Sequence, residues 1–272
     1  MELYQLNQGK IPYLSFPVLE TIPWIRHGFS TRLGGVSTGI HRSMNLGFQN
    51  GDEKENVYEN YARICDVIGV KPESIVHAKQ THLDQYRIVD YDDIGKGYNR
   101  ERDYDDIDAL VTNHSGITLT ILTADCVPVY LVDPENKAIG LVHSGWSGTV
   151  KRIAAKTVQG MMSAYGTKPA QVIAVTGPCI CADCFEVGDE VADAFLNEFG
   201  SNRFSLITHK VDERYHINLV ESIAQSLLDI GLNSSNIHQS GLCTACNPDL
   251  LFSHRVTQGK RGTMAAFLSI NE

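Results

Sequence analysis

Hydrophobic positions recur along the chain with two periods, one typical of helices and one typical of strands. Between residues 52 and 69 they follow the helical period, acidic residues occupy the first turn, and Asp52 is placed to cap it. The same period predicts three further helices. The four predicted helices cover 52–69, 149–165, 188–199 and 217–230.

Short runs rich in β-branched residues predict strands between these helices. The first fifty residues combine short hydrophobic runs with prolines and turns, and the polar stretch 95–108 is expected to form a surface loop. Because strands follow one another as often as they alternate with helices, the order predicts an α+β fold with mixed β-sheets flanked by helices. The later predicted strands cover 74–78, 86–90, 116–124, 127–132, 138–143, 172–176, 250–256 and 264–270.

Length and charge limit what the chain can be. Its 272 residues fit one large domain or two small ones, and because no linker is apparent we expect a single domain over 1–272. The formal charge of −9, without a local basic patch, disfavours a phosphate backbone as partner, so we expect no nucleic-acid role. We also expect no membrane association, because no apolar run approaches the ~20 residues that a membrane helix needs.

The oxidation state expected for the cysteines depends on the cellular compartment. The N-terminal residues show no basic segment followed by an apolar run, so no signal peptide is predicted and we expect a cytoplasmic protein with reduced thiols. Two clusters, Cys179/Cys181/Cys184 and Cys243/Cys246, look like a split structural zinc site. Such a site requires two pairs of ligands to meet in space, and free thiols are the favoured interpretation.

Three metal-capable side chains stand at the ends of predicted strands, namely His82, Cys126 and His143. Two histidines and a cysteinate are a normal ligand set for catalytic zinc, which keeps three protein ligands and one open position. The three residues are too far apart in the sequence to form a local zinc motif. A buried thiol beside two hydrogen-bonded histidines is therefore the alternative.

Other polar residues near these strand ends are candidates for anion binding. Ser144, Gly145 and Gly148 lie in a turn that leads into a predicted helix, where backbone N–H groups can approach phosphate. A tight turn without a ligand would also explain these glycines. Arg32 lies in a glycine-containing loop and has the fork geometry for phosphate or carboxylate, although a solvated arginine is the simpler interpretation.

Two carboxylates have several available roles. Asp125, next to Cys126, could act as a general acid or base, support a ligand histidine or shape a turn. Asp108 has the same alternatives.

A series of short motifs runs in order from about residue 25 to the C-terminus. The motifs are His27–Arg32, Gly34–Ser37, Asn45–Gly47, Gln80–His82, Asp108–Thr112, Thr123–Pro128, His143–Gly148, Gly177–Ile180, Phe185–Gly188, Cys243–Thr244 and Phe252–Arg255. Together they resemble the YlmD/YfiH-like family, also called the laccase-domain or multicopper polyphenol oxidoreductase family, and most of all its YlmD-type members from Bacillus-type bacteria. The segment between Gln85 and Asp108 is longer than in many members and is expected to reshape the pocket entrance.

The resemblance implies an α/β/β/α-like sandwich with zinc held by His82, Cys126 and His143, and copper as a substitute metal. It implies phosphorolysis of adenosine, inosine, guanosine and methylthioadenosine to the base and ribose 1-phosphate, and hydrolytic deamination of adenosine. The implied partners are purine nucleosides and phosphate, with a homodimer as the candidate assembly. The assigned residues are Asp125 and Arg32 in catalysis, and Arg32, Asn45, Ser144, Gly145 and Gly148 in substrate or phosphate binding.

Three functions of other classes stay open. A metal-free amidohydrolase acting on peptidoglycan precursors would use Cys126 as nucleophile and His143 as base. A copper-dependent polyphenol oxidase is disfavoured, because the ten histidines include no His-x-His pair. A non-enzymatic zinc protein would need a closed site with four ligands, and three are evident.

Overall fold

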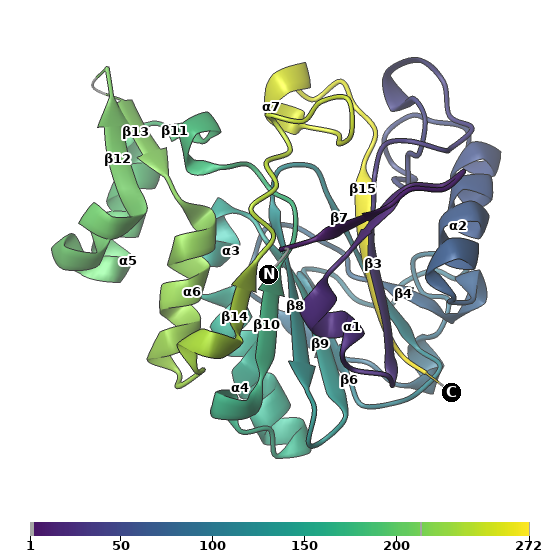
Figure 1. Cartoon of the computed structure of the whole chain (residues 1–272), viewed down its shortest axis with the longest axis horizontal. Coiled ribbons are helices and arrows are strands. Elements are labelled where there is room, and N and C mark those ends of the chain that lie inside the picture. The colour runs from purple at the N-terminus through teal and green to yellow at the C-terminus, as the bar shows by residue number, and fades with distance from the viewer. Residues whose placement is uncertain (1–2, 213, 272) are drawn as a thin grey trace.

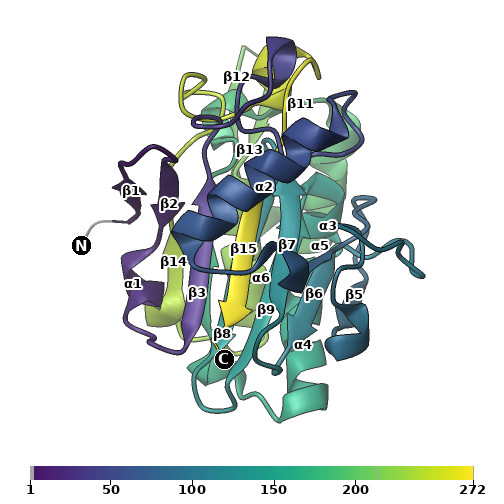
Figure 2. The same cartoon turned by 90° about the vertical axis from the view of Figure 1, so that its right-hand side faces the viewer.

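Two six-stranded sheets lie face to face and carry helices on their outer faces (Figures 1 and 2), in a computed structural model that describes residues 3–212 and 214–271. In order, the first sheet contains β1 (Gln5–Asn7), β2 (Tyr13–Ser15), β3 (Ile25–Ser30), β15 (Met264–Ile270), β7 (Thr118–Thr123) and β4 (Ile75–His77). The second contains β14 (Ile237–Gln239), β10 (Ile173–Thr176), β8 (Val127–Asp133), β9 (Ala138–Ser144), β6 (Ala109–Thr112) and β5 (Tyr86–Ile88). Both sheets are mixed, since β4 with β7, β5 with β6 and β10 with β14 pair in parallel and their other pairs are antiparallel.

The central strands are buried on both faces, as their continuous hydrophobic runs require. In β8, Tyr130 and Val132 point into the core between the two sheets, whereas Val129 and Leu131 point to the helices on the other side. This alternation follows the period of two along a strand. It gives the predicted α/β/β/α-like arrangement, and the α+β fold class is confirmed.

Helices close the two outer faces. Figure 2 shows α2 (Lys54–Ile68) across the first sheet, where Val57, Tyr61 and Ile64 pack against Phe267 of β15. On the second sheet, α4 (Ile153–Tyr165) and α6 (Leu219–Asp229) cover the other face. The remaining helices are α1 (Pro17–Glu20), α3 (Trp146–Val150), α5 (Asp189–Ile207) and α7 (His254–Thr257).

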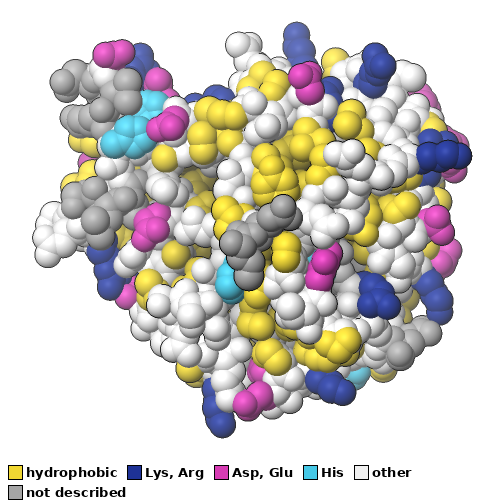
Figure 3. Space-filling view, viewed as in Figure 1, with side chains coloured by type: hydrophobic (Ala, Val, Ile, Leu, Met, Phe, Trp, Pro, Cys, Tyr) yellow, Lys and Arg dark blue, Asp and Glu magenta, His cyan; other side chains and the backbone are white. Residues whose placement is uncertain are grey.

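A third, small sheet stands at the left of Figure 1 next to α5. It contains β11 (Glu186–Val187), β13 (Arg214–Ile217) and β12 (Thr208–Val211). Among the described residues, no helix has the length and apolar character needed to cross a membrane. Figure 3 shows acidic and basic side chains interspersed around the margin of one face, with hydrophobic side chains toward its middle.

Several predicted elements need correction. The helix expected over 149–165 is divided into α3 and α4 because Arg152 adopts a left-handed conformation, with φ of 60°, and binds Glu198 and Asp229. The strand expected over 250–256 is wrong. The Ser253 hydroxyl accepts the Val256 N–H at 3.3 Å and thereby starts α7.

The cap expected at Asp52 is also shifted, because Glu53 is the N-cap residue of α2. Asp52 instead accepts the Glu53 N–H at 3.0 Å and the Asn45 side-chain amide at 2.9 Å. The helix expected over 188–199 continues as α5 to Ile207, with a non-helical residue at Gly200.

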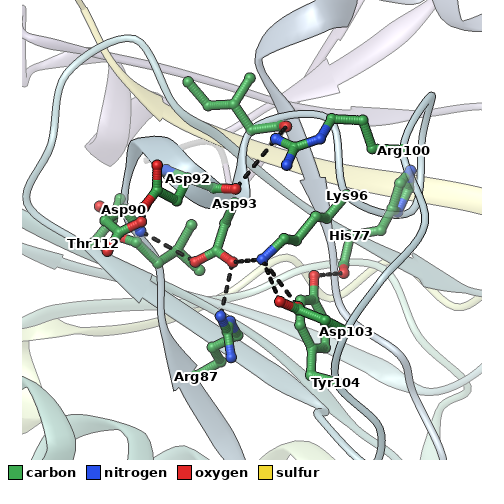
Figure 4. A network of polar contacts seen from close by, with 12 residues as sticks. His77, Arg87, Asp90, Asp92, Asp93, Lys96, Arg100, Asp103, Tyr104 and Thr112 are labelled. Atoms are coloured by element: carbon green, nitrogen blue, oxygen red, sulfur yellow. Dashed lines mark hydrogen bonds and ion pairs between the residues drawn. The ribbon is translucent and has the colours of Figure 1, made fainter.

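The segment 95–108, expected as a surface loop, includes a buried ionic network (Figure 4). The Lys96 ammonium lies 2.8 Å from Asp93 and 2.9 Å from Asp103, and Arg87 binds Asp93 at 2.8 Å. The Tyr104 hydroxyl donates to the His77 carbonyl at 2.6 Å. The ion pairs therefore hold this segment to Asp93 and to Arg87 of β5, and the Tyr104 hydroxyl with the backbone fastens it against β4 as a wall.

Candidate active site

A pocket of about 640 Å³ opens where β4, β7 and β9 end. This volume lies within the range of about 300–1,000 Å³ that small-molecule sites occupy. Its lining comes from residues 47–50, 77–82 and 122–126, from His143 and Trp146, and from the segments that carry Phe185, Arg255 and Arg261. Gly97 and Arg102 of the 95–108 wall complete one side, so the longer segment after Gln85 does reach the pocket.

The side chains of His82, Cys126 and His143 come together where these strands end. Their ligand atoms all lie within 4.8 Å of one another. The planes of the two imidazole rings are 80° apart and their centroids are separated by 4.9 Å, so the rings meet edge to face and are not stacked. Three side chains that are distant in the sequence thus form one group of metal-capable donors.

Asp108 holds two of these ligands in place. One carboxylate oxygen lies 2.8 Å from Nδ1 of His143, which leaves Nε2 of that ring for another partner. The same carboxylate accepts the backbone N–H groups of Thr81, His82 and Leu83 at 3.1, 3.1 and 2.9 Å. A fully buried carboxylate therefore fixes both the ring of His143 and the loop that presents His82.

The electrostatics of the group favour a thiolate. Burial raises the pKa of the Cys126 thiol, but the adjacent His143 and His82 outweigh burial and bring this pKa to about 6. Burial lowers the pKa of His143, and Cys126 together with Asp108 raises it to about 9. Thiolate is the form of cysteine that binds metals and attacks carbonyl carbons.

The site fits a metal ion by its donor chemistry and by its close packing. A nitrogen, nitrogen and sulfur set with one solvent-facing side is the usual composition of a catalytic zinc site. At Gly145 a side-chain carbon would stand 3.2 Å from Sγ of Cys126 and 3.0 Å from the His82 ring, so only glycine leaves the ligands undisturbed. His82 itself adopts a left-handed conformation with φ of 64°.

Asp125 lines the same pocket with its carboxylate fixed at both oxygens. The Thr244 hydroxyl donates to Oδ1 at 2.6 Å, and the backbone N–H of Arg255 donates to Oδ2 at 2.7 Å. The residue has a φ of 96° and lies next to Cys126. It is placed beside the metal-capable group, and its acid–base role stays a prediction.

The residues predicted to bind phosphate lie outside the pocket lining. The Arg32 guanidinium donates to the carbonyls of Pro248 at 2.6 Å and Arg42 at 3.1 Å and covers the ring of Phe252. Asn45 is buried and bonds to the Thr263 N–H at 2.9 Å, and Ser144 is buried against Thr149. Gly145 and Gly148 lie behind the ligand loops rather than in the open pocket.

The pocket has other cationic groups that the sequence did not single out. Lys79, Arg102, Arg255, Arg261 and His254 all belong to its lining. Nε of Arg261 is buried and finds no hydrogen-bond partner in the described part of the chain, while its NH1 group donates to Thr263 at 2.9 Å. Burial lowers the pKa of this guanidinium, so an anionic partner would be favoured there. For His254 and Arg255 the sequence did carry a signal, the motif Phe252–Arg255, but no role was assigned to its cations.

Aromatic side chains occupy other parts of the lining. Phe48, Trp146 and Phe185 come from three separate segments, and Trp146 is the first residue of α3. Aromatic faces suit planar heterocycles, and the cations suit anions.

Comparisons with known proteins place this site in context. Residues 26–271 match the family model of the multi-copper polyphenol oxidoreductase laccase. The chain is 35% identical to the purine nucleoside phosphorylase YlmD of Bacillus subtilis, over 90% of this chain and 88% of that one. It is 33% identical to an adenosine deaminase of an unknown prokaryotic organism, over 84% and 87% of the two chains.

The solved structures agree in fold. The hypothetical protein YfiH of Bacillus licheniformis superposes with a TM-score of 0.93 at 31% identity, and YlmD of Geobacillus stearothermophilus with 0.90 at 29%, each over 100% of both chains.

Proposed function

Because the chain belongs to the multi-copper polyphenol oxidoreductase laccase family, whose relatives above include a purine nucleoside phosphorylase and an adenosine deaminase, we propose that it is a zinc-dependent enzyme with both activities. The proposed substrates are adenosine, inosine, guanosine and methylthioadenosine together with phosphate. The observation that carries the proposal is the convergence of His82, Cys126 and His143 around a pocket that also offers aromatic and cationic groups.

His82, Cys126 and His143 are the proposed zinc ligands, and the same donors would accept copper as a substitute. When bound, a zinc ion with an open position lowers the pKa of water to about 7 and can polarise an electron-rich atom of the substrate. Asp108 keeps His143 in the tautomer that directs Nε2 toward the site. Asp125 is the proposed group for moving a proton to or from the purine, because it lies in the lining beside Cys126.

For phosphorolysis, a phosphate oxygen forms a bond to the anomeric carbon of the ribose as the bond from that carbon to the purine nitrogen breaks. Positive charge builds on the ribose and negative charge on the leaving base. We assign phosphate binding to Arg261 with His254, since both line the pocket and Nε of Arg261 has no hydrogen-bond partner among the described residues. Arg32, whose donors already bind backbone carbonyls, is assigned to holding its own loop.

The test is incubation of the zinc-loaded protein with adenosine, with and without phosphate, followed by chromatography. Inosine should form without phosphate, and adenine with ribose 1-phosphate should appear when phosphate is added. A protein of known zinc content that yields neither set of products would reject the proposal.

One observation favours a second candidate. Cys126, His143 and Asp108 have the order of a nucleophile, a base and an orienting carboxylate. A cysteine amidohydrolase would therefore use the same three residues on an amide such as a peptidoglycan precursor. Its activity would survive removal of metal by a chelator, whereas the nucleoside chemistry would be lost.

A further inference from the structure

Four cysteines that the proposed reaction does not use meet beside the pocket. Cys181 and Cys184 belong to the segment that joins β10 to β11, and Cys243 and Cys246 to the segment that joins β14 to α7. Both segments run toward the top of Figure 1. The four Sγ atoms all lie within 4.8 Å of one another, and the seven cysteines of the chain are free thiols.

The two segments are held in register by their backbones. Cys179 and Cys243 form a parallel bridge, in which Cys179 donates to the Leu242 carbonyl at 3.2 Å and accepts from Thr244 at 3.0 Å. From this bridge onward, Cys181 faces Cys243 and Cys184 faces Cys246, each pair 62 residues apart in the sequence. Each segment supplies a Cys-x-x-Cys spacing to the common centre.

The surroundings of the sulfur atoms suit ligands rather than unrelated thiols. Sγ of Cys243 accepts the backbone N–H groups of Cys181 at 3.3 Å and of Cys246 at 3.4 Å. Hydrogen bonds to the sulfur stabilise a thiolate and orient it toward a metal ion. The Sγ atoms of Cys184 and Cys246 lie 3.5 Å apart, in contact but unbonded.

We propose that Cys181, Cys184, Cys243 and Cys246 bind a second zinc ion, which is structural and separate from the ion assigned to the pocket. Four thiolates from two Cys-x-x-Cys pairs form a closed tetrahedral zinc site, without an open position for water. Binding exchanges four S–H bonds for four Zn–S bonds and releases four protons to solvent, so it needs no oxidant. The condition that the sequence left open, that the two pairs meet in space, is fulfilled here.

The second zinc ion would hold together the side of the pocket that Phe185, Arg255 and Asp125 form. Thr244, inside the second pair, donates to Asp125, and Arg255 donates to the carbonyls of Cys184 at 3.3 Å and Glu186 at 3.0 Å. The guanidinium of Arg255 also lies 5.5 Å from the centre of the Phe185 ring. Phe185, Arg255 and Asp125 all line the pocket, so a fixed cysteine centre positions one side of it.

Metal analysis of the full chain, purified without chelator, tests the proposal directly. Wild type should contain about two zinc ions per chain, one for each ligand group. Cys184→Ser with Cys246→Ser should lose one ion and the Cys126→Ala variant should lose the other. Cys179→Ala is the matched control, since it removes a neighbouring thiol outside the group and should keep both ions.

X-ray absorption of the Cys126→Ala protein identifies the remaining site even if the double serine variant fails to fold. We expect zinc with four sulfur neighbours at about 2.3 Å. This result upholds the proposal whether or not the protein converts adenosine. Zinc with nitrogen or oxygen neighbours, a coloured iron–sulfur centre, or no metal at all in Cys126→Ala would overturn it.

In the double serine variant, the nucleoside KM should rise several-fold more than kcat falls, because the pocket ligands remain. Equal losses in both constants, with the pocket zinc ion retained and the second ion lost, would reject the positioning role.

Discussion

The two groups of metal-capable residues in this chain differ in how they are held. His82, Cys126 and His143 stand at the ends of sheet strands, and a buried aspartate outside the group orients them. The four cysteines stand on two loops that are joined to each other by a single backbone bridge. Contacts within the protein therefore hold the first group in place, whereas we expect the second to depend more on a bound ion for rigidity.

This difference separates chemistry from support. A three-ligand group leaves a position for substrate or water, and a rigid frame keeps that position constant during turnover. A closed four-sulfur group leaves no open coordination position for substrate or water. Its value lies in the residues on the same loops, Thr244 and Phe185, which it holds against the pocket.

The largest expected effect comes from removing the pocket thiol. Cys126→Ala should lower kcat for both nucleoside reactions by at least about 100-fold, since stabilisation of charge in a dry site is worth this much or more. The melting temperature should change little, because Asp108 still holds the histidine loops. Steady-state kinetics and calorimetry would measure the two effects.

Cys65→Ala is the control for this experiment, as Cys65 lies on the buried face of α2 and does not line the pocket. Retained activity in Cys126→Ala would mean that the thiol neither binds the metal nor reacts. If Cys126→Ala lost activity but wild-type protein stayed active after its zinc was removed by a chelator, the result would favour the cysteine amidohydrolase.

The next effect concerns the frame rather than a ligand. Asp108→Asn replaces a carboxylate that accepts from three backbone N–H groups and His143 by an amide with one acceptor oxygen. Zinc affinity and kcat should fall by about 10- to 100-fold, the usual cost of losing such a supporting residue. Zinc titration and kinetics would show both changes together.

Asp133→Asn is the matched control, because Asp133 is equally buried but serves the turn between β8 and β9. If the Asp108 variant binds zinc like wild type, the rigid frame is not what distinguishes the two groups.

A smaller effect is expected at the anion side of the pocket. Arg261→Ala should raise the KM for phosphate by about 10-fold or more, the value of one charged hydrogen bond. Deamination, which uses no phosphate, should lose less. Arg32→Ala should instead lower stability with little change in KM for phosphate, because its contacts are with Pro248, Arg42 and Phe252. If Arg32→Ala raised the KM for phosphate and Arg261→Ala did not, phosphate binding would be assigned to Arg32 instead of Arg261.

The sequence was sufficient for the layers of the fold and for the metal-capable residues. The two-residue period of β8 and the helical period of α2 are strong because both elements bury a long hydrophobic face. His82, Cys126 and His143 could be found because each stands at or beyond the end of a strand with a clear pattern. Functional side chains tend to gather in the loops at strand ends, because the sheet holds these loops rigidly, and the three residues do converge at one end of the sheets.

The sequence was insufficient where long-range contacts decide the local structure. Residues 250–256 look like a strand, but the cap at Ser253 and the bond from Arg255 to Asp125 turn the segment into the pocket. The cations of this segment were missed for that reason. Likewise, Asp93 and Lys96 appear as surface charges in the sequence, and only their pairing makes them part of a wall.

The last effect develops only on acidification and concerns the stability of the fold rather than either metal group, and it is needed to interpret acid release of either ion. His27 lies on β3 with Nε2 accepting the Phe16 N–H at 2.9 Å, an interaction that requires the neutral ring. Burial lowers the pKa of His27 from 6.5 to about 4. Between these two values the unfolded chain binds the extra proton and the folded chain does not, so stability should fall with falling pH.

The expected slope from His27 is about 1.4 kcal/mol per pH unit across this window, and it should level off at either end. His27→Gln should remove this part of the slope and leave the zinc content at each pH unchanged. Chemical denaturation from pH 7 to pH 4, with metal analysis of the same samples, would measure both quantities. If the variant keeps the full slope, the acid sensitivity belongs to the metal groups. Their relative order of zinc release would then become the direct comparison between a site that contains histidine and one made of thiolates alone.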